Sequence, residues 1–279
     1  MFTKIPHLLL ISLLILSSRV FPQCRAEPGT EEVETGTEEV ENEREFAYIG
    51  NATIGPKEWG KMHPEWETCS NGEIQSPIDI SRSGVVGKHD LGVLKPKYKA
   101  APASVKNRGH DIMVSWHGDA GDIKINGTRY SLKQLHWHSP AEHTFDGLRH
   151  QMEVHLVHET PQGKIAVVAI TYDYGKSDPF LDTVIPHIAR IGEEDRGIGV
   201  VDPRGVKMPT KQYYRYIGSL TVPPCTEGVV WTIVKKVKTV SKKQVHALRE
   251  SVHDNAEENA RPLQQKKERK VWYYSHKSA

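Results

Sequence analysis

The chain has 279 residues, of which 37% are hydrophobic, and its 37 Lys and Arg nearly balance its 35 Asp and Glu, giving a net charge of +2 at pH 7. This length and composition fit one globular domain with tails. A charge so close to neutral gives no reason to expect nucleic-acid binding. No apolar run is long enough to predict a membrane span.

The first 26 residues have the pattern of a secretory signal peptide. Lys4 precedes the apolar run Leu8–Leu16, which is too short to cross a bilayer, and Ala26 ends a candidate cleavage site. A buried N-terminal strand is the alternative. The pattern predicts entry into the secretory pathway and a location outside the cell.

The cysteine count agrees with export. The chain has three cysteines, and cleavage after Ala26 removes Cys24 and leaves the pair Cys69 and Cys225. In an oxidising compartment this even pair is expected to form one disulfide. Two unrelated free thiols are the alternative.

Two N-x-[ST] sequons, at Asn51 and Asn126, are candidate glycosylation sites in an exported chain. Asn126-Gly127 also has the composition of a two-residue hairpin turn, because both residues tolerate a positive φ. A hairpin tip is exposed, so the turn and a glycan are compatible at this position.

Both ends of the expected domain carry charged segments. Residues 27–45 include nine Glu and few apolar groups, which predicts a disordered acidic segment because little apolar burial opposes the entropy of ordering. Residues 266–279 are basic and aromatic, and we expect a solvated tail there. The globular domain is expected to span residues 46–265.

The domain contains short alternating or β-branched runs between turn residues, including IQSPIDI, TRYSLKQLHWH, MEVHLVH, IAVVAITYDY and VVWTIV. This spacing predicts a mostly β (α+β) single domain built on a large, mainly antiparallel sheet. Two peripheral helices are also expected. One begins at Asp178-Pro179 and kinks or ends near Pro186, and the other begins at a capping box formed by Ser241 and Gln244.

The densest group of histidines lies between Gln134 and His158. His136 and His138 are spaced i, i+2, so on a strand their rings lie on one face. His155 lies in the next apolar run, and pairing of the two strands would bring three imidazoles to one point. Gln134 and Glu153 each stand two residues before a histidine and are expected to accept its N–H. Three neutral imidazoles with a fourth open position predict a catalytic zinc site.

The segment QLHWHSPAEHTFDG, followed by EVHLVH, resembles the zinc-binding core of the α-class carbonic anhydrases, in particular plant-type members of the secretory pathway. The resemblance extends in order through GPKEWG, IQSPIDI, NRGHDI, GSLTVPPCTEGVVWTIV and ENARPLQ. It covers most of the expected domain. It implies a central twisted sheet of about ten strands with peripheral helices, and it matches Cys69 and Cys225 to the cysteine pair of secreted members.

The resemblance also implies an activity, the reversible hydration of carbon dioxide to bicarbonate and a proton by zinc-bound hydroxide. Thr221 would orient the hydroxide and donate its own proton to Glu142, while His110 would export the product proton. Substrate-binding positions would be Thr221, Val222, Val157, Val167, Leu220 and Trp231. Val222 stands where many members carry a polar residue. His143 and His158 are interpreted as structural hydrogen-bonding residues.

Several expectations about partners follow from the same resemblance. The substrate would be a small molecule, sulfonamide-type inhibitors would bind, and an esterase reaction would be a side activity. Some plant-type members reach the chloroplast stroma through the secretory route, so this is the alternative to the cell wall. A storage or binding protein with weak or no turnover is the alternative function. The sequence leaves the oligomeric state open.

Overall fold

The computed structural model of the protein describes residues 43–49, 53–189, 191–192, 194–252 and 258–276. The expected signal peptide, most of the acidic segment and the sequon at Asn51 lie outside these residues. None of the helices in the described ranges has the length and apolar character that crossing a membrane requires.

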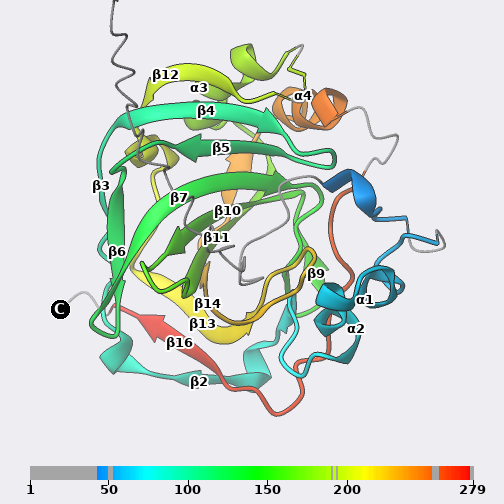
Figure 1. The fold of residues 1–279 in the computed structure, drawn as a ribbon. Coiled ribbons are helices and arrows are strands. Elements are labelled where there is room, and N and C mark those ends of the chain that lie inside the picture. The colour runs from blue at the N-terminus through cyan, green and yellow to red at the C-terminus, as the bar shows by residue number, and fades with distance from the viewer. Residues whose placement is uncertain (1–42, 50–52, 190, 193, 253–257, 277–279) are drawn as a thin grey trace, which may run out of the picture. The chain divides into compact units, whose positions relative to one another are not determined.

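A large twisted β-sheet dominates the described residues (Figure 1). Its strands are β2 (Val85–Gly87), β3 (Lys97–Tyr98), β4 (Ala101–Asn107), β5 (Ile112–Trp116), β6 (Gly121–Ile125), β7 (Thr128–His138), β10 (Met152–Glu159), β11 (Ile165–Tyr174), β12 (Arg196–Val201), β13 (Gln212–Ser219), β14 (Glu227–Val234), β15 (Lys238–Val240) and β16 (Val271–Ser275). Ten of them follow one path in the order β12-β4-β5-β7-β10-β11-β14-β13-β16-β2. The pairs β11–β14, β11–β15 and β16–β2 are parallel and the others antiparallel, which confirms the expected fold class.

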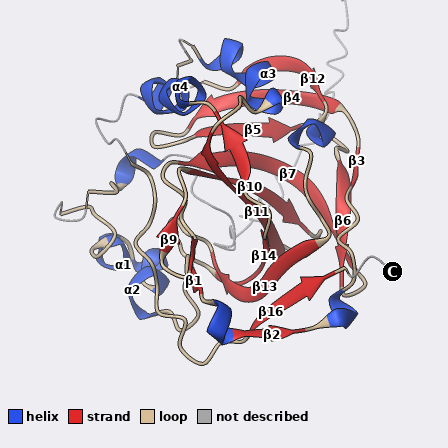
Figure 2. Cartoon of the chain, turned by 180° about the vertical axis from the view of Figure 1, so that it is seen from behind, coloured by secondary structure: helices blue, strands red, loops and turns tan. Residues whose placement is uncertain are grey.

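The remaining elements are short and peripheral. A small sheet contains β1 (Asp79–Ile80), β8 (Thr144–Phe145) and β9 (Leu148–Arg149). The α-helices are α1 (Trp59–Met62), α2 (Thr68–Asn71), α3 (Pro179–Ile188) and α4 (Lys242–Val252), and the 3-10 turns are η1 (Glu43–Glu45), η2 (Pro64–Trp66), η3 (Arg82–Gly84), η4 (His89–Leu91) and η5 (Pro203–Val206). Both views place α3 and α4 together beside β4 and β5, away from α1 and α2 (Figure 2).

The two longer helices begin where the sequence predicts. Asp178 caps α3 by accepting hydrogen bonds from the backbone N–H groups of Phe180 and Leu181, at 3.0 and 3.2 Å. The helix continues two residues past the exposed Pro186 and ends at Ile188. Ser241 and Gln244 cap α4 reciprocally, at 3.2 and 3.1 Å, as a capping box does.

The turn at Asn126-Gly127 also matches its sequence prediction. β6 and β7 pair as an antiparallel hairpin around these two residues, whose φ angles are +48° and +84°. Positive φ at both central positions is the geometry that favours Asn-Gly. Asn126 is exposed, so the sequon remains a glycosylation candidate.

Both ends of the domain differ from the sequence prediction. The segment expected to be a basic solvated tail contains β16, which pairs with β13 and β2 and buries Val271 and Tyr274. At the other end, Glu43 belongs to the segment expected to be disordered, yet it lies in η1 and is fully buried. Composition gave the wrong prediction in both cases, because it does not report contacts with distant residues. Val271 and Tyr274 are buried by neighbouring strands, and Glu43 is paired with Arg108.

The two faces of the sheet carry different side chains: one packs in the main core, and the other carries the three clustered histidines. On β7 and β10, Leu135, Trp137, Val154 and Leu156 belong to the main core, which also includes residues of α3 and α4. Because side chains alternate along a strand, the residues between them point to the opposite face. His136, His138 and His155 therefore lie on the face away from these helices.

A disulfide between Cys69 and Cys225 ties α2 to the loop between β13 and β14, 156 residues away in sequence. This confirms the expected pairing. Both cysteines pack with Phe46, Trp59 and Val222 in a separate apolar cluster. The loop that carries Thr221 is thus fixed covalently to the N-terminal part of the domain.

We expect the double variant Cys69→Ser/Cys225→Ser to lose about 2–5 kcal/mol of free energy of unfolding, because the cross-link restricts the unfolded chain over a long loop. Urea denaturation followed by tryptophan fluorescence measures the change. A reducing agent should destabilise the parent to a similar extent and leave the variant unchanged. Equal free energies of unfolding for the parent and the variant would show that the disulfide does not stabilise the fold.

Candidate active site

Three histidine rings converge between β7 and β10. His136 stands directly opposite His155 in the antiparallel register, and His138 follows two residues along the same face. The ring centroids are 5.0 Å apart for His136–His138, 5.2 Å for His136–His155 and 4.5 Å for His138–His155. One ring nitrogen from each residue lies within 4.8 Å of the others, a grouping that could hold a metal ion.

Each of these rings also contacts a hydrogen-bond acceptor. Nδ1 of His136 lies 2.9 Å from Oε1 of Gln134, and Nε2 of His155 lies 2.9 Å from Oε1 of Glu153. Nδ1 of His138 lies 2.7 Å from the backbone carbonyl of Asn259. An N–H donated to such an acceptor determines the tautomer and places the lone pair on the opposite nitrogen.

The environment favours the neutral imidazole of His136 and of His155. Burial lowers the pKa of His155 to about 4, with a further lowering from His138. Burial and the charge of Arg108 lower the pKa of His136 well below its usual value. Burial alone would raise the pKa of Glu153, but His143 and His155 hold that carboxyl well below its usual range. Neutral imidazole is the form that binds a metal.

Two buried polar atoms at this point have no hydrogen-bond partner among the described residues: Nε2 of His138 and Oε2 of Glu142, 3.7 Å apart. Leaving a buried donor or acceptor unsatisfied costs about 1–3 kcal/mol. Nδ1 of His138 already faces the carbonyl of Asn259, so Nε2 is the nitrogen that carries the lone pair. The donor set and its unsatisfied atoms fit a divalent cation bound by three imidazoles.

Glu142 and Thr221 are both buried, and Oε2 of Glu142 lies 3.7 Å from Nε2 of His138. Oε1 of Glu142 accepts the backbone N–H of Arg261 at 2.8 Å. The expected hydrogen bond from Thr221 to Glu142 is not formed among the described residues, since Oε2 of Glu142 lacks a partner. Glu142 is nevertheless held by Arg261 and Arg149, with one carboxylate oxygen that has no hydrogen-bond partner among the described residues.

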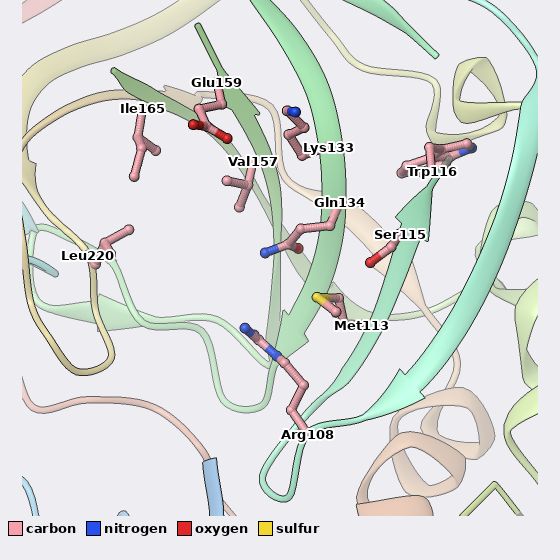
Figure 3. A pocket seen from close by; sticks show the side chains of 10 residues that line it. All are labelled: Arg108, Met113, Ser115, Trp116, Lys133, Gln134, Val157, Glu159, Ile165 and Leu220. Atoms are coloured by element: carbon pink, nitrogen blue, oxygen red, sulfur yellow. The ribbon is translucent and has the colours of Figure 1, made fainter. Parts of the chain in front are cut away.

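A cavity of about 240 Å³ opens beside β5 and β7, which contribute Met113 and Gln134 to its lining (Figure 3). Gln134, the partner of His136, lines it. Its apolar wall contains Met113, Val157, Ile165 and Leu220, and its polar lining consists of Arg108, Ser115, Lys133, Gln134 and Glu159, with Trp116 at one side. The cavity therefore joins an apolar wall to a charged rim next to the metal-binding group.

The predicted substrate-binding residues fall into three positions. Val157 and Leu220 line the cavity. Val167 and Trp231 lie in the apolar cluster that supports it, with the Trp231 ring 4.9 Å from that of His155. Val222 packs with Phe46, Tyr48 and the disulfide instead of lining the cavity. The apolar side chain of Val222 suits this buried position.

His110 is buried, with 8% of its surface exposed. Its Nε2 lies 2.5 Å from the carbonyl oxygen of Phe46, and its ring packs against the rings of Phe46 and Tyr48. It does not line the cavity of Figure 3 but lines a second cavity, together with Arg44, Asn107 and Ile191 and other residues. Arg108 and His110, two residues apart in the same loop, thus line different cavities.

His143 and His158, which the sequence analysis interprets as structural residues, both form hydrogen bonds. His143 lies 2.7 Å from Oε1 of Glu153 and 2.7 Å from the hydroxyl of Tyr216. His158 lies 2.6 Å from the hydroxyl of Tyr98 and 3.1 Å from the carbonyl of Ala166. His143 and Glu153 also form a second grouping of possible ligand atoms with His155, but their atoms already bond one another.

Sequence reasoning missed two residues with clear positions. Asn259, in the segment ENARPLQ, contacts His138 through its carbonyl and bonds Ser139, Trp137 and His110 through its side chain. Arg108 lines the cavity. The only available signal was their place in the segments NRGHDI and ENARPLQ.

Fold and site together place three buried histidines that could bind a metal ion on a mixed β-sheet. The sequence profile of the eukaryotic-type carbonic anhydrases matches residues 54–275. Alpha carbonic anhydrase 4 of Arabidopsis thaliana is 48% identical over 234 residues, which cover 84% of this chain and 87% of that protein. The chain therefore belongs to the eukaryotic-type (alpha) carbonic anhydrase family.

Two solved structures are also similar. A dioscorin complexed with ascorbate has a TM-score of 0.82 and 43% identity, covering 84% of this chain and 100% of that one. The alpha carbonic anhydrase of Thermovibrio ammonificans, in complex with the inhibitor sulfanilamide, has a TM-score of 0.75 and 35% identity, covering 81% and 98%.

We expect buried His158 to make the protein less stable in acid. Burial lowers its pKa from the usual 6.5 to about 4, so the unfolded chain binds more protons between these values and stability falls as the pH drops through that window. The loss attributable to this residue is about 3 kcal/mol. Urea denaturation of metal-free protein at pH 7 to pH 4 measures it.

His158→Gln should weaken this pH dependence, because the amide does not titrate in that window. His246→Gln is the matched control, since that histidine lies on the exposed face of α4. Parallel pH profiles for the parent and His158→Gln would contradict the expected contribution.

Proposed function

We propose that this protein is a zinc enzyme that interconverts carbon dioxide and bicarbonate. Family membership supports carbon dioxide hydration in general. The observation that carries the proposal is the convergence of three buried imidazoles, one of which has a nitrogen without a hydrogen-bond partner among the described residues.

His136, His138 and His155 would hold the metal. Zinc in such a site supplies Lewis acidity that lowers the pKa of water toward neutrality, as is established for carbonic anhydrases. Neutral imidazoles suit this role because they leave the positive charge of the cation uncompensated. Gln134, Glu153 and the Asn259 carbonyl keep the three rings in the required tautomers.

Glu142 and Thr221 would direct the attacking oxygen. An ionised carboxylate only accepts hydrogen bonds, so Glu142 requires Thr221 to donate its proton and to turn a lone pair toward the metal site. Val157 and Leu220 provide an apolar wall for carbon dioxide, which has no charge to be solvated.

Each hydration releases a proton, and we propose His110 as its carrier because an imidazole titrates near neutral pH. Its ring is held by the Phe46 carbonyl, on the side of the loop away from the main cavity. The proton would leave toward the second cavity, and a ring rotation away from Phe46 would be needed for uptake.

A binding or storage role is the second candidate. It is favoured by the similarity to a dioscorin whose structure holds ascorbate. The similarity to a sulfanilamide complex supports the proposal that sulfonamides bind this chain as well.

We further propose that the protein enters the secretory pathway, with the cell wall or the chloroplast as its destination. The N-terminal sequence pattern and the Cys69–Cys225 bond support this route.

Zinc-loaded protein lacking residues 1–26 should hydrate carbon dioxide in a stopped-flow pH-indicator assay. His138→Ala should lose zinc and activity together, whereas Thr221→Ala should keep zinc and lose about a hundred-fold in kcat. Zinc content is measured by mass spectrometry. Sulfonamide-insensitive proton release, or no hydration with zinc fully bound, would favour the binding or storage role.

His110→Ala should slow turnover in dilute buffer by about ten-fold or more, because proton export then depends on water. Concentrated imidazole buffer should restore most of the rate, since it carries the proton in place of the side chain. His187→Ala, an alteration on α3, serves as the control. Parent-like rates of His110→Ala in dilute buffer would rule out the assignment.

A further inference from the structure

The position of the Glu142 carboxylate matters to the proposed reaction, because this carboxylate is the acceptor that directs Thr221. Its Oε2 lies 3.7 Å from Nε2 of His138 and 4.0 Å from Nε2 of His155. Misplacing a group of this kind by about 1 Å can cost about a hundred-fold in rate. Whatever fixes the backbone of Glu142 therefore bears on the chemistry.

Arg149 holds two consecutive carbonyl groups of the loop that carries Glu142. Its Nη1 donates to the carbonyl of Ala141 at 2.5 Å and to the carbonyl of Glu142 at 3.3 Å. These carbonyls belong to the peptide groups before and after the Cα of Glu142, so one nitrogen restricts both φ and ψ of that residue. Hydrogen bonds from an ionised donor are stronger than those between neutral groups.

The hairpin formed by β8 and β9 brings Arg149 to this loop. Thr144 and Arg149 stand opposite each other in its register, and the turn residues Asp146-Gly147 have φ angles of +49° and +79°. The N–H of Ala141 donates to the carbonyl of His150 at 3.1 Å and closes the loop at its base. The chain thus returns past Glu142 with the Arg149 side chain directed at the two carbonyls.

The guanidinium of Arg149 contributes through these bonds more than through packing. Its side chain is half-buried and lines a cavity of about 340 Å³ together with His150 and Pro262. Among the described residues, the two carbonyls are its only hydrogen-bond partners and no carboxylate pairs with it. A charged group beside open space therefore binds the backbone of Glu142 and little else.

We propose that Arg149 is a positioning residue that fixes the carboxylate of Glu142 through these two carbonyls. The inference rests on the proposed function, in which that carboxylate directs Thr221. The other end of Glu142 is held by Arg261, whose backbone N–H donates to Oε1 at 2.8 Å. With the backbone and one carboxylate oxygen both held, Oε2 is confined to its place beside the clustered histidines.

Metal binding does not depend on Arg149. The three clustered histidines take their acceptors from Gln134, Glu153 and the Asn259 carbonyl, and none of these bonds involves Arg149. The apolar wall proposed for carbon dioxide lies elsewhere, at Val157 and Leu220. Loss of the Arg149 bonds should therefore lower kcat and leave both zinc content and KM unchanged.

The first test needs neither zinc nor activity. It measures hydrogen exchange of the Arg261 amide by NMR in the metal-free full chain, because this N–H donates to Glu142 and reports how firmly the carboxylate is held. Arg149→Met keeps an unbranched stem without a donor and should speed this exchange about ten-fold, the scale of one lost hydrogen bond. Arg149→Lys should restore it, since Nζ can reach both carbonyls as Nη1 does.

Two controls separate a local effect from a general one. Arg204→Met removes an exposed guanidinium that bonds Asp202, and it should leave the Arg261 amide unchanged. The amide of Val168, in the core strand β11, should exchange at the parent rate in every variant. A parent-like rate at Arg261 in Arg149→Met overturns the proposal, and so does an equal acceleration at Val168, which would show loosening of the whole fold.

If Arg149→Met does not fold by near-ultraviolet circular dichroism, the Arg149 guanidinium of the parent is observed directly by 15N NMR. Restricted rotation about its Nε–Cζ bond supports the proposal. Free rotation overturns it, because a guanidinium held by two carbonyls cannot turn.

The second test is a double-mutant cycle on hydration by the zinc-loaded protein, followed by 18O exchange where the rate is low. Arg149→Met should lower kcat about ten-fold in the parent and have no further effect in Glu142→Gln, because both residues act through one carboxylate. An equal loss in both backgrounds overturns the route through Glu142. If the zinc-loaded parent does not hydrate carbon dioxide, the proposed function fails, and the exchange rate of the Arg261 amide still decides the role of Arg149.

Discussion

The site depends on keeping three imidazoles buried, neutral and oriented at the same time. A buried histidine loses solvation of its charged form, which lowers its pKa, and a metal needs the neutral form. Neutrality alone leaves the tautomer open, however. Acceptors on Gln134, Glu153 and Asn259 resolve that choice, one for each ring. Burial and hydrogen bonding thus act together, and neither would suffice alone.

The acceptor Glu153 connects the site to distant elements. Its carboxylate faces both His155 and His143, and His143 continues to the hydroxyl of Tyr216 on β13. That hydroxyl lies 2.8 Å from the hydroxyl of Ser76, close to the N-terminal part of the domain. A buried polar chain of this kind is stable only when every member has a partner. Metal-site geometry is therefore linked to the packing of segments that do not touch the metal.

The sequence predicted the parts of this arrangement that follow from local periodicity. Alternation along β7 placed His136 and His138 on one face, and the same two-residue spacing identified Gln134 and Glu153 as partners. The helix caps at Asp178 and Ser241 and the Asn126-Gly127 turn were predictable for the same reason, because each depends on a few adjacent residues. The Cys69–Cys225 bond followed from counting cysteines.

What the sequence did not predict depends on contacts between distant segments. The Asn259 carbonyl meets His138 across 121 residues, and a backbone carbonyl has no signature in sequence. The strand β16 lies in a basic segment whose composition suggests solvation, yet β13 provides its partner. Val222 was expected to bind substrate because of the family resemblance, but its side chain packs with Phe46 and the disulfide.

The loop from Asn107 to Asp111 is where these distant contacts meet. On one side Arg108 enters the cavity, and on the other His110 meets the Phe46 carbonyl. The segment beginning at Glu43 touches both residues, so it belongs to the site although its composition continues that of the acidic segment before it. A charged residue that adjoins a solvated run can be ordered when a buried group of opposite charge lies within reach, as the Arg108 guanidinium does for Glu43.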